Sequence, residues 1–208
     1  SIASSWNQRR KNPSPVLKTL PTPSQNSIVL DAGCANARNS IVLSKNAKKV
    51  FAIDNSAQML KLAKQNASGC KNVFFKRADV RKLPFENNFF DSTYCLATLH
   101  LIPRASGRLK AMREFHRVLK QNGFLCLTAW NFHQQKFSSL KPIKSMNFPI
   151  GWTIDGKKVK RVYHFFQKTE LISLAKQAGF KKIKCFYEKN GLRHAKKGAA
   201  NLVLTATK

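Results

Sequence analysis

The sequence of 208 residues predicts an α/β fold, a mostly parallel sheet covered by helices on both faces. Three observations indicate this. Short apolar runs alternate with segments of helical period, an aspartate ends each of the first three runs, and no break in composition divides the chain. We therefore expect one domain over residues 1–208, long enough to bury a single core.

Strands are expected where apolar residues run together between polar or turn-forming residues. The first five runs are "SIVLD" ending at Asp31, "KKVFAID" ending at Asp54, "NVFFKRAD" ending at Asp79, "FDSTYCLAT" beginning near Asp91, and "GFLCLTAW" ending at Trp130. Two more runs lie at 180–189 and 200–207, on either side of a basic, turn-rich piece. This last pair indicates an antiparallel hairpin at one edge of the sheet.

Helices are expected in the intervening segments. Ser56 is a typical N-cap for a helix over 56–67, and the segment 107–123 is amphipathic and stops at Gly123. A third helix is expected over 168–179. Residues 131–166 show no clear period, and we interpret them as an insertion after the fifth strand that binds the substrate.

The charge of the chain is strongly positive. Lys and Arg number 38 against 9 Asp and Glu, a formal net charge of +29. Such a surface concentrates polyanions, so nucleic acid is the leading candidate partner, although lysine can also serve solubility alone. No apolar run approaches the roughly 18 to 20 residues that span a membrane, and no signal-peptide pattern stands at the start, so we expect a soluble, cytoplasmic protein.

The cysteines predict neither a zinc site nor a disulfide framework, because all five are scattered without a CxxC pair. We expect reduced, mostly buried thiols and no metal. His116 and Cys126 are assigned to packing.

The few acidic residues are informative because they are rare. Asp31, Asp54 and Asp79 lie 23 and 25 residues apart, each at the carboxyl end of an expected strand. In an open α/β sheet that edge lines the ligand crevice, and an acid at the end of the second strand is placed to accept hydrogen bonds from ribose hydroxyls. The alternative is that these aspartates cap the following helices.

The turn after the first strand lacks the glycines of a dinucleotide site. Where GxGxxG would stand, the chain has Gly33, Ala35 and Arg38, so no pyrophosphate is expected there. A nucleoside with an amino-acid tail still needs one close turn and an acid for its ammonium group. S-adenosylmethionine fits this description.

With these pieces the sequence resembles the class I S-adenosylmethionine-dependent methyltransferases, through "VLDAGCANA", "AIDNS", "RADVRKLPFENNFFD" and "REFHRVLKQNGFLCLTAW". The resemblance implies a Rossmann-like sheet of seven strands, mostly parallel, with a C-terminal antiparallel hairpin. It also implies a set of cofactor-binding residues: Asp31, Gly33, Ala35, Asp54, Asn55, Asp79, Val80 and Leu96.

More narrowly, the chain resembles the methyltransferases that esterify carboxymethyluridine at the tRNA wobble position. This resemblance rests on "SIASSWNQRRKNPSPVL", "ATLHLIPR", "TAWNFHQQ", "KRVYHFFQKTEL" and "YEKNG". It implies that the insertion and the basic N-terminal segment hold tRNA, and that a small zinc-ribbon subunit binds as an activator. We expect that subunit at the edge of the third strand, near Phe74 and Phe75, unless the protein's own helices cover both rings.

The resemblance also implies the reaction site. The expected catalytic residues are His100, Arg10, Arg161 and His164, and the expected substrate-binding residues are Arg9, Arg104, Trp130 and Tyr163. A carboxylate acceptor is already ionised, so positioning and an arginine grip supply the catalysis without a general base. The alternatives are that Trp130 and Tyr163 are core aromatics, that His100 is a satisfied polar group, and that the basic clusters are solvated charge.

The chain departs from the family pattern at several positions. Ala35 and Ala37 replace glycines usual in the first motif, Leu101 stands where a second histidine often follows, and Gly191 and Leu192 replace an aromatic pair. Two rival functions stay open: a methyltransferase of a small molecule such as a quinone precursor, which shares the same cofactor motifs, and a non-catalytic RNA-binding scaffold, in which Ala35 and Ala37 abolish cofactor binding.

Overall fold

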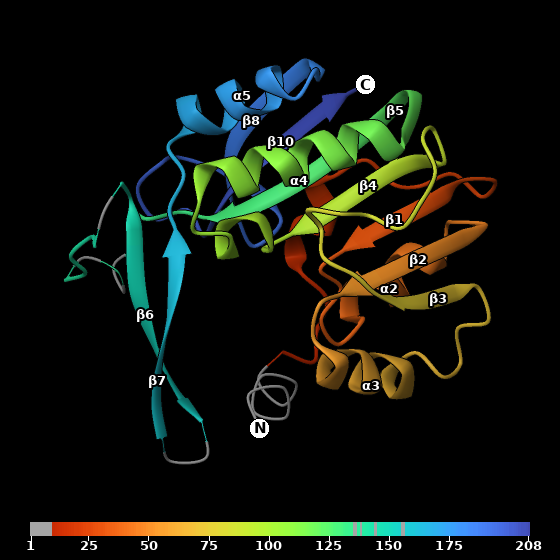
Figure 1. The fold of residues 1–208 in the computed structure, drawn as a ribbon, viewed down its shortest axis with the longest axis horizontal. Coiled ribbons are helices and arrows are strands. Elements are labelled where there is room, and N and C mark those ends of the chain that lie inside the picture. Colours follow the sequence, from red (N-terminus) through yellow and green to blue (C-terminus); the bar gives the residue numbers. More distant parts are fainter. Residues whose placement is uncertain (1–9, 135–136, 138, 144, 155–156) are drawn as a thin grey trace.

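The computed structural model describes residues 10–134, 137, 139–143, 145–154 and 157–208. Its main sheet has eight strands in the order β3-β2-β1-β4-β5-β10-β8-β9 (Figure 1). The strands of this sheet are β1 (Ile28–Ala32), β2 (Lys49–Asp54), β3 (Val73–Arg77), β4 (Phe90–Leu96), β5 (Leu119–Trp130), β8 (Lys181–Lys189), β9 (Leu192–His194) and β10 (Asn201–Thr207). The helices are η1 (Pro15–Thr19), α2 (Arg38–Ser44), α3 (Ala57–Asn66), η2 (Leu99–Leu101), α4 (Ala105–Val118) and α5 (Lys168–Gln177).

Two apolar layers sandwich this sheet, one on each face. Because successive side chains of a strand point to opposite faces, Leu30 packs with α4 and α5 whereas its neighbour Val29 packs with η1, α2 and α3. Figure 1 shows the same division, with α4 and α5 on the face opposite α2. Strands β1 to β5 pair in parallel, as expected for strands joined by crossover helices.

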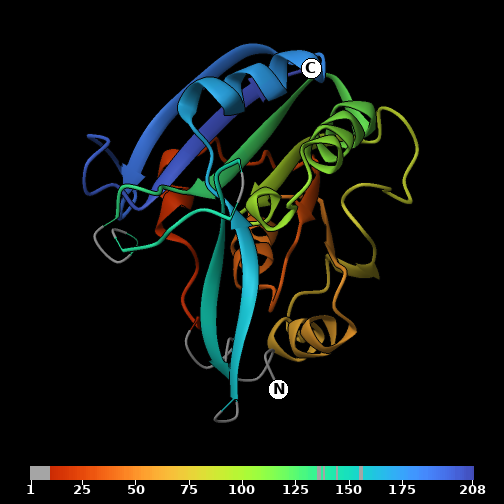
Figure 2. The same cartoon turned by 60° about the vertical axis from the view of Figure 1, so that its left-hand side comes forward.

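The expected insertion contains regular structure that the sequence analysis missed. Strands β6 (Asn147–Ile154) and β7 (Lys157–His164) form a separate antiparallel sheet. Figures 1 and 2 show this pair extending away from the main sheet on the side where the parallel strands end. The hairpin carries its own apolar cluster, with Phe148, Tyr163 and Phe165 buried. The insertion therefore adds a wall beside the edge where a ligand would bind.

The C-terminal strands differ in one respect from the expected edge hairpin. Strands β8 and β10 do pair antiparallel, but β10 lies inside the sheet between β5 and β8. The short strand β9 adds to β8 and forms the edge, which raises the strand number from the expected seven to eight. Since β9 lies within the basic piece 190–199, its polar composition concealed it.

The helix expected over 107–123 is shorter than predicted. Helix α4 ends at Val118, and Leu119 is already extended with ψ 140. Leu119 pairs with Phe90 of β4, and Asn122 adopts a left-handed φ of 63 where the register shifts. The amphipathic period continues past Val118 in the sequence, but the residues from Leu119 onward pair with β4. Pairing within the sheet therefore sets the end of α4.

Three smaller outcomes complete the fold. Helix α2 was not anticipated, because it is short and begins after a left-handed Ala37 without a side-chain cap. The thiols of Cys34, Cys95 and Cys126 are buried, those of Cys70 and Cys185 are partly buried, and all five are free. Within the described ranges, no helix is long and apolar enough to cross a membrane.

Candidate active site

The turn that follows β1 is held between the ends of β2 and β4. The backbone N–H groups of Gly33 and Cys34 both donate to the carbonyl of Ile53 at 2.8 Å. Gly33 has φ +87, and a Cβ there would lie 2.1 Å from Oγ1 of Thr98, which follows β4. Position 33 therefore requires glycine, and Thr98 packs against this turn, a contact that the sequence did not indicate.

The two alanines that replace the usual glycines keep glycine-like backbone conformations. Ala35 has φ 50 and Ala37 has φ 65, both in the left-handed region. A non-glycine residue there costs roughly 1–2 kcal/mol. The turn thus retains the shape of a glycine-rich loop although it holds a single glycine, and the exchange does not by itself block the cofactor site.

Asp31, at the end of β1, is buried with 1% of its surface exposed. Its Oδ2 accepts a hydrogen bond from the Ser40 hydroxyl at 2.6 Å. Burial raises the pKa of this carboxyl to about 6, and the neighbouring Asp54 carboxylate acts in the same direction, while Ser40 and the Arg38 guanidinium oppose the rise. Two carboxyls therefore share one poorly solvated space beside the turn.

Asp54 is the last residue of β2 and ties the turn to that strand. Its Oδ2 accepts from the Ala35 N–H at 3.0 Å and its Oδ1 from the Ser56 N–H at 2.9 Å. Ser56 itself caps α3 as expected, accepting from the Met59 N–H. Burial raises the pKa of Asp54, whereas the hydrogen bonds and the charge of Arg161 lower it. The neighbouring Asn55 is exposed.

The other residues expected to bind the cofactor, Asp79, Val80 and Leu96, lie near the same edge of the sheet. Strand β3 ends at Arg77, two residues before Asp79, which the sequence analysis placed at the strand end. The Asp79 carboxylate forms an ion pair with Arg81 at 2.5 Å. Val80 and, at the end of β4, Leu96 are buried and offer apolar surface.

The basic N-terminal segment crosses the cofactor turn. The Asn36 side chain donates to the carbonyl of Arg10 at 3.0 Å, and the Arg38 guanidinium donates to the carbonyl of Asn12 at 2.7 Å. The guanidinium of Arg10 then lies 5.8 Å from the centre of the Trp130 ring. Asn36 and Arg38 thus hold the backbone of the segment that brings Arg10, one of the expected catalytic residues, close to Trp130, and no local sequence pattern indicates this role.

Three expected site residues form a cluster that we call the aromatic stack: His100 from η2, Trp130 from the end of β5, and Tyr163 from β7. The ring centres of Trp130 and Tyr163 are 5.0 Å apart with planes at 9°, and those of His100 and Tyr163 are 5.4 Å apart at 26°. Residues 63 positions apart in the chain therefore meet beyond the carboxyl ends of the sheet. These rings cover one another on the faces that they share, so those faces are not available to a substrate.

His100 is an unusual member of this stack. Its side chain is 1% exposed, and its Nδ1 has no hydrogen-bond partner among the described residues. Burial lowers the pKa of His100 to about 3, and the charges of Arg10, His164 and Arg161 add to this. The imidazole is therefore neutral at physiological pH and presents one unused nitrogen.

The remaining expected residues are dispersed. Arg161, on β7, is exposed, and its charge acts on both His100 and Asp54. His164 is turned away from the stack, in contact with Asn147 and Glu170. Arg104 is an exposed residue at the start of α4. Arg9 lies outside the described residues.

Comparison with known proteins decides the family. The methyltransferase domain family matches residues 30–127. A demethylmenaquinone methyltransferase of Staphylococcus haemolyticus is 32% identical over 173 residues, covering 76% of this chain and 70% of the relative. This chain belongs to the class I S-adenosylmethionine-dependent methyltransferases.

Two further comparisons describe this methyltransferase. A tRNA (carboxymethyluridine(34)-5-O)-methyltransferase of Arabidopsis thaliana is 32% identical over 125 residues, 60% of this chain but 28% of that protein. A solved S-adenosylmethionine-dependent methyltransferase from Methanosarcina mazei superposes with a TM-score of 0.75 at 22% identity, covering 95% of this chain and 98% of the other. The Rossmann-like methyltransferase fold is thereby confirmed.

The cofactor of this methyltransferase is S-adenosylmethionine, which supplies an electrophilic methyl group. The residues present fit it. The turn at Gly33 allows a close backbone approach, Asp54 can accept from a ribose, and Asp31 and Asp54 supply negative charge for a cationic tail. Among the described residues no group of three or more His, Cys, Asp or Glu is arranged to hold a metal.

Proposed function

We propose that this methyltransferase esterifies a carboxylate, the carboxymethyl group of the wobble uridine in tRNA. The observation that carries the proposal is the electrostatics of the aromatic stack. Arg10 and Arg161 act on it, whereas its titratable ring, His100, is neutral. An anionic acceptor would be stabilised by these positive charges, because guanidinium groups bind carboxylates in matched geometry.

The acids of the chain support an acceptor that needs no deprotonation. Outside the cofactor turn, the described acids are engaged elsewhere or lie apart from the stack. Three of them form ion pairs with basic side chains: Asp79 with Arg81, Asp91 with Lys120, and Glu114 with Arg117. Glu170 contacts His164, Glu188 accepts a hydrogen bond from the Gly191 N–H, and Glu86 lines a groove beside α4. A quinol or phenol acceptor must lose a proton to a base, and an imidazole with a pKa of about 3 is a poor one.

The charge of the chain supports RNA as the carrier of that carboxylate. The net charge is +29, and exposed cations follow the hairpin at Lys158, Lys160 and Arg161 and the β9 region at Arg193 and Lys196. Each phosphate contact would make binding weaker at higher salt. We therefore assign Arg9 and Arg104 to the RNA surface as well, as the resemblance implies.

We also propose a small zinc-ribbon subunit as an activating partner, bound at β3. This strand is an edge of the described sheet, and Phe74 is 43% exposed while Phe75 packs against α3 residues such as Ala63. Of the two phenylalanines, Phe74 is therefore the one whose ring a partner could cover. A partner strand could pair with the free edge and cover Phe74.

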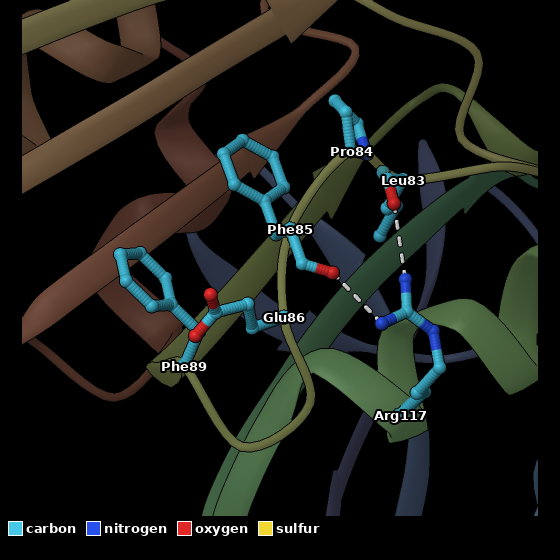
Figure 3. A pocket seen from close by; sticks show the side chains of 6 residues that line it. All are labelled: Leu83, Pro84, Phe85, Glu86, Phe89 and Arg117. Carbon is cyan, nitrogen blue, oxygen red and sulfur yellow. Dashed lines mark hydrogen bonds between the residues drawn. The ribbon is translucent and has the colours of Figure 1, made fainter.

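A groove lies near this edge. It has a volume of about 560 Å³ and is lined by Leu83, Pro84, Phe85, Glu86, Phe89 and Arg117. Figure 3 shows the Arg117 guanidinium donating to the carbonyls of Leu83 and Phe85, which holds the loop in place. Phe51 connects the β3 edge with the groove, since its ring centre lies 5.4 Å from that of Phe74 and 5.5 Å from that of Phe85. One apolar partner face could therefore cover both.

The decisive experiment offers the methyltransferase two acceptors with labelled S-adenosylmethionine. tRNA carrying carboxymethyluridine is analysed by nucleoside mass spectrometry, with and without a co-expressed zinc-ribbon subunit, and demethylmenaquinol is assayed in parallel. We expect a new methyl ester on the tRNA and, at saturating S-adenosylmethionine, a rate without an inflection between about pH 7 and pH 8, above the range in which Asp31 titrates. Methylation of the quinol alone would refute the proposal, and no cofactor binding would favour a non-catalytic scaffold.

The partner proposal has its own test. Phe74→Glu places a charge on the exposed edge, while the control Phe186→Glu places the same charge on a partly buried phenylalanine of β8, far along the strand order from β3. We expect co-purification of the zinc-ribbon subunit to be lost only in the first variant. Equal retention in both variants would exclude the β3 edge.

A further inference from the structure

Glu170, on α5, contacts His164 of β7 and Arg108 of α4, and these two side chains adjoin the segments that supply Tyr163 and His100 to the aromatic stack. Its Oε1 is 2.7 Å from Nε2 of His164 and 3.4 Å from Nη2 of Arg108. We propose that Glu170 is a positioning residue, which holds the loop of His100 and the strand of Tyr163 at the spacing that the stack requires.

The Arg108 arm of this network reaches the loop of His100. Arg108 is buried in α4, and its Nη1 donates to the carbonyls of Ile102 at 3.0 Å and Pro103 at 2.7 Å. These carbonyls stand two and three residues after His100, immediately past η2. Movement of the guanidinium would therefore carry that loop with it.

The His164 arm reaches the strand of Tyr163. His164 is the last residue of β7, 2% exposed, and successive side chains of a strand point to opposite faces. Tyr163 accordingly joins the stack while His164 faces α5. The Nδ1 of His164 lies 3.1 Å from Oδ1 of Asn147, its partner on β6, so both strands of the hairpin are attached at this point.

The two arms meet at one carboxylate oxygen. A carboxylate only accepts hydrogen bonds, so Nε2 of His164 carries the proton in this contact. Hydrogen bonds to an ionised acceptor are shorter and stronger than neutral ones, which suits an anchor between separate elements. The insertion hairpin extends away from the main sheet (Figure 1), and it meets the body at aromatic side chains such as Trp130, whose ring centre lies 5.0 Å from that of Tyr163 and 6.5 Å from that of Trp152. An anchor at its base therefore controls where Tyr163 and Arg161 lie.

The test compares three variants at position 170 with a matched control. Glu170→Ala removes the anchor, Glu170→Gln keeps an oxygen for His164 but loses the charge that Arg108 meets, and Glu170→Asp shortens the reach. The control is Asp91→Asn, which breaks the ion pair with Lys120 at 2.8 Å at the other end of β4. The side chains of Asp91 and Glu170 are similarly exposed, at 35% and 37%.

We expect Glu170→Ala to lower kcat/KM for the acceptor about 10- to 100-fold, because small displacements of a reacting group have effects of that size. The Kd for S-adenosylmethionine should stay unchanged, since no contact links Glu170 to the cofactor turn in the described residues. Glu170→Gln should retain an intermediate rate, and Asp91→Asn the full rate. Equal losses in Glu170→Ala and Asp91→Asn would mean that Glu170 serves stability alone.

A second measurement does not depend on activity, because the activity readout rests on the proposed function. The ring protons of His100 lie over Tyr163 and Trp130, so the ring currents shift their NMR resonances. We expect these resonances to move toward unstacked values in Glu170→Ala and to stay in place in Asp91→Asn. Unmoved resonances would overturn the positioning role, whereas moved resonances in a protein inactive on tRNA would refute only the proposed substrate.

Discussion

The buried Asp31 carboxyl should destabilise the fold at neutral pH. Its pKa is raised from 3.8 to about 6, chiefly by burial. A carboxyl with a higher pKa in the folded chain than in the unfolded chain binds protons more tightly when folded. The free energy of unfolding therefore falls as pH rises from about 4 to about 6, and the loss is complete above that range.

The size of the effect follows from the shift. One pKa unit corresponds to about 1.4 kcal/mol, so the charged carboxyl costs about 3 kcal/mol near pH 7.5. Asp31→Asn removes the charge and keeps an oxygen that can accept the Ser40 hydrogen bond. We expect the variant to gain up to about 3 kcal/mol of unfolding free energy near pH 7.5 and almost nothing near pH 4.

Urea unfolding of both proteins at the two pH values measures this difference. Titrating groups that do not interact with Asp31 are common to the pair and cancel in the comparison, whereas Asp54 interacts with Asp31 and contributes to the difference. An equal gap at both pH values, or a variant less stable at neutral pH, would refute the reasoning.

The same variant should bind S-adenosylmethionine about tenfold more weakly in calorimetry, because a charged partner for its ammonium group is lost. A gain in unfolding free energy together with a loss of cofactor affinity would show that Asp31 serves binding at a cost in stability.

Three further substitutions test the cofactor turn. Asp54→Asn should weaken S-adenosylmethionine binding about tenfold in calorimetry, since a ribose hydroxyl loses a charged acceptor, and an unchanged Kd would place the ribose elsewhere. Gly33→Ala should lower the unfolding free energy by about 3 kcal/mol or more, because its Cβ would overlap Thr98, while Gly69→Ala, with nothing within 4 Å, should change it by less than about 1 kcal/mol. Ala35→Gly should raise it by about 0.5 to 1 kcal/mol, because relief of the left-handed backbone is partly offset by the larger conformational entropy that glycine loses on folding, and a loss of stability in urea would contradict that account.

The fold was predictable because its signals are local. Apolar runs and helical period placed the five parallel strands and three of the helices, and an aspartate after β2 indicated a nucleoside ligand before any contact was known. Errors arose where tertiary pairing overrode a local pattern. Leu119 continued an amphipathic period yet joined β5, and the polar composition around Leu192 hid an edge strand.

The sequence by itself determined the family, the cofactor edge of the sheet and the excess of positive charge, since each depends on residue type and short-range spacing. Only the tertiary structure decided which distant side chains meet. The stack of His100, Trp130 and Tyr163 exists because a hairpin without periodic signal folds back across the carboxyl edge, and Arg10 reaches it because Asn36 holds the segment. Burial is likewise a property of the whole fold. Burial is the largest cause of the lowered pKa of His100 and of the raised pKa of Asp31, and no local pattern carries that information.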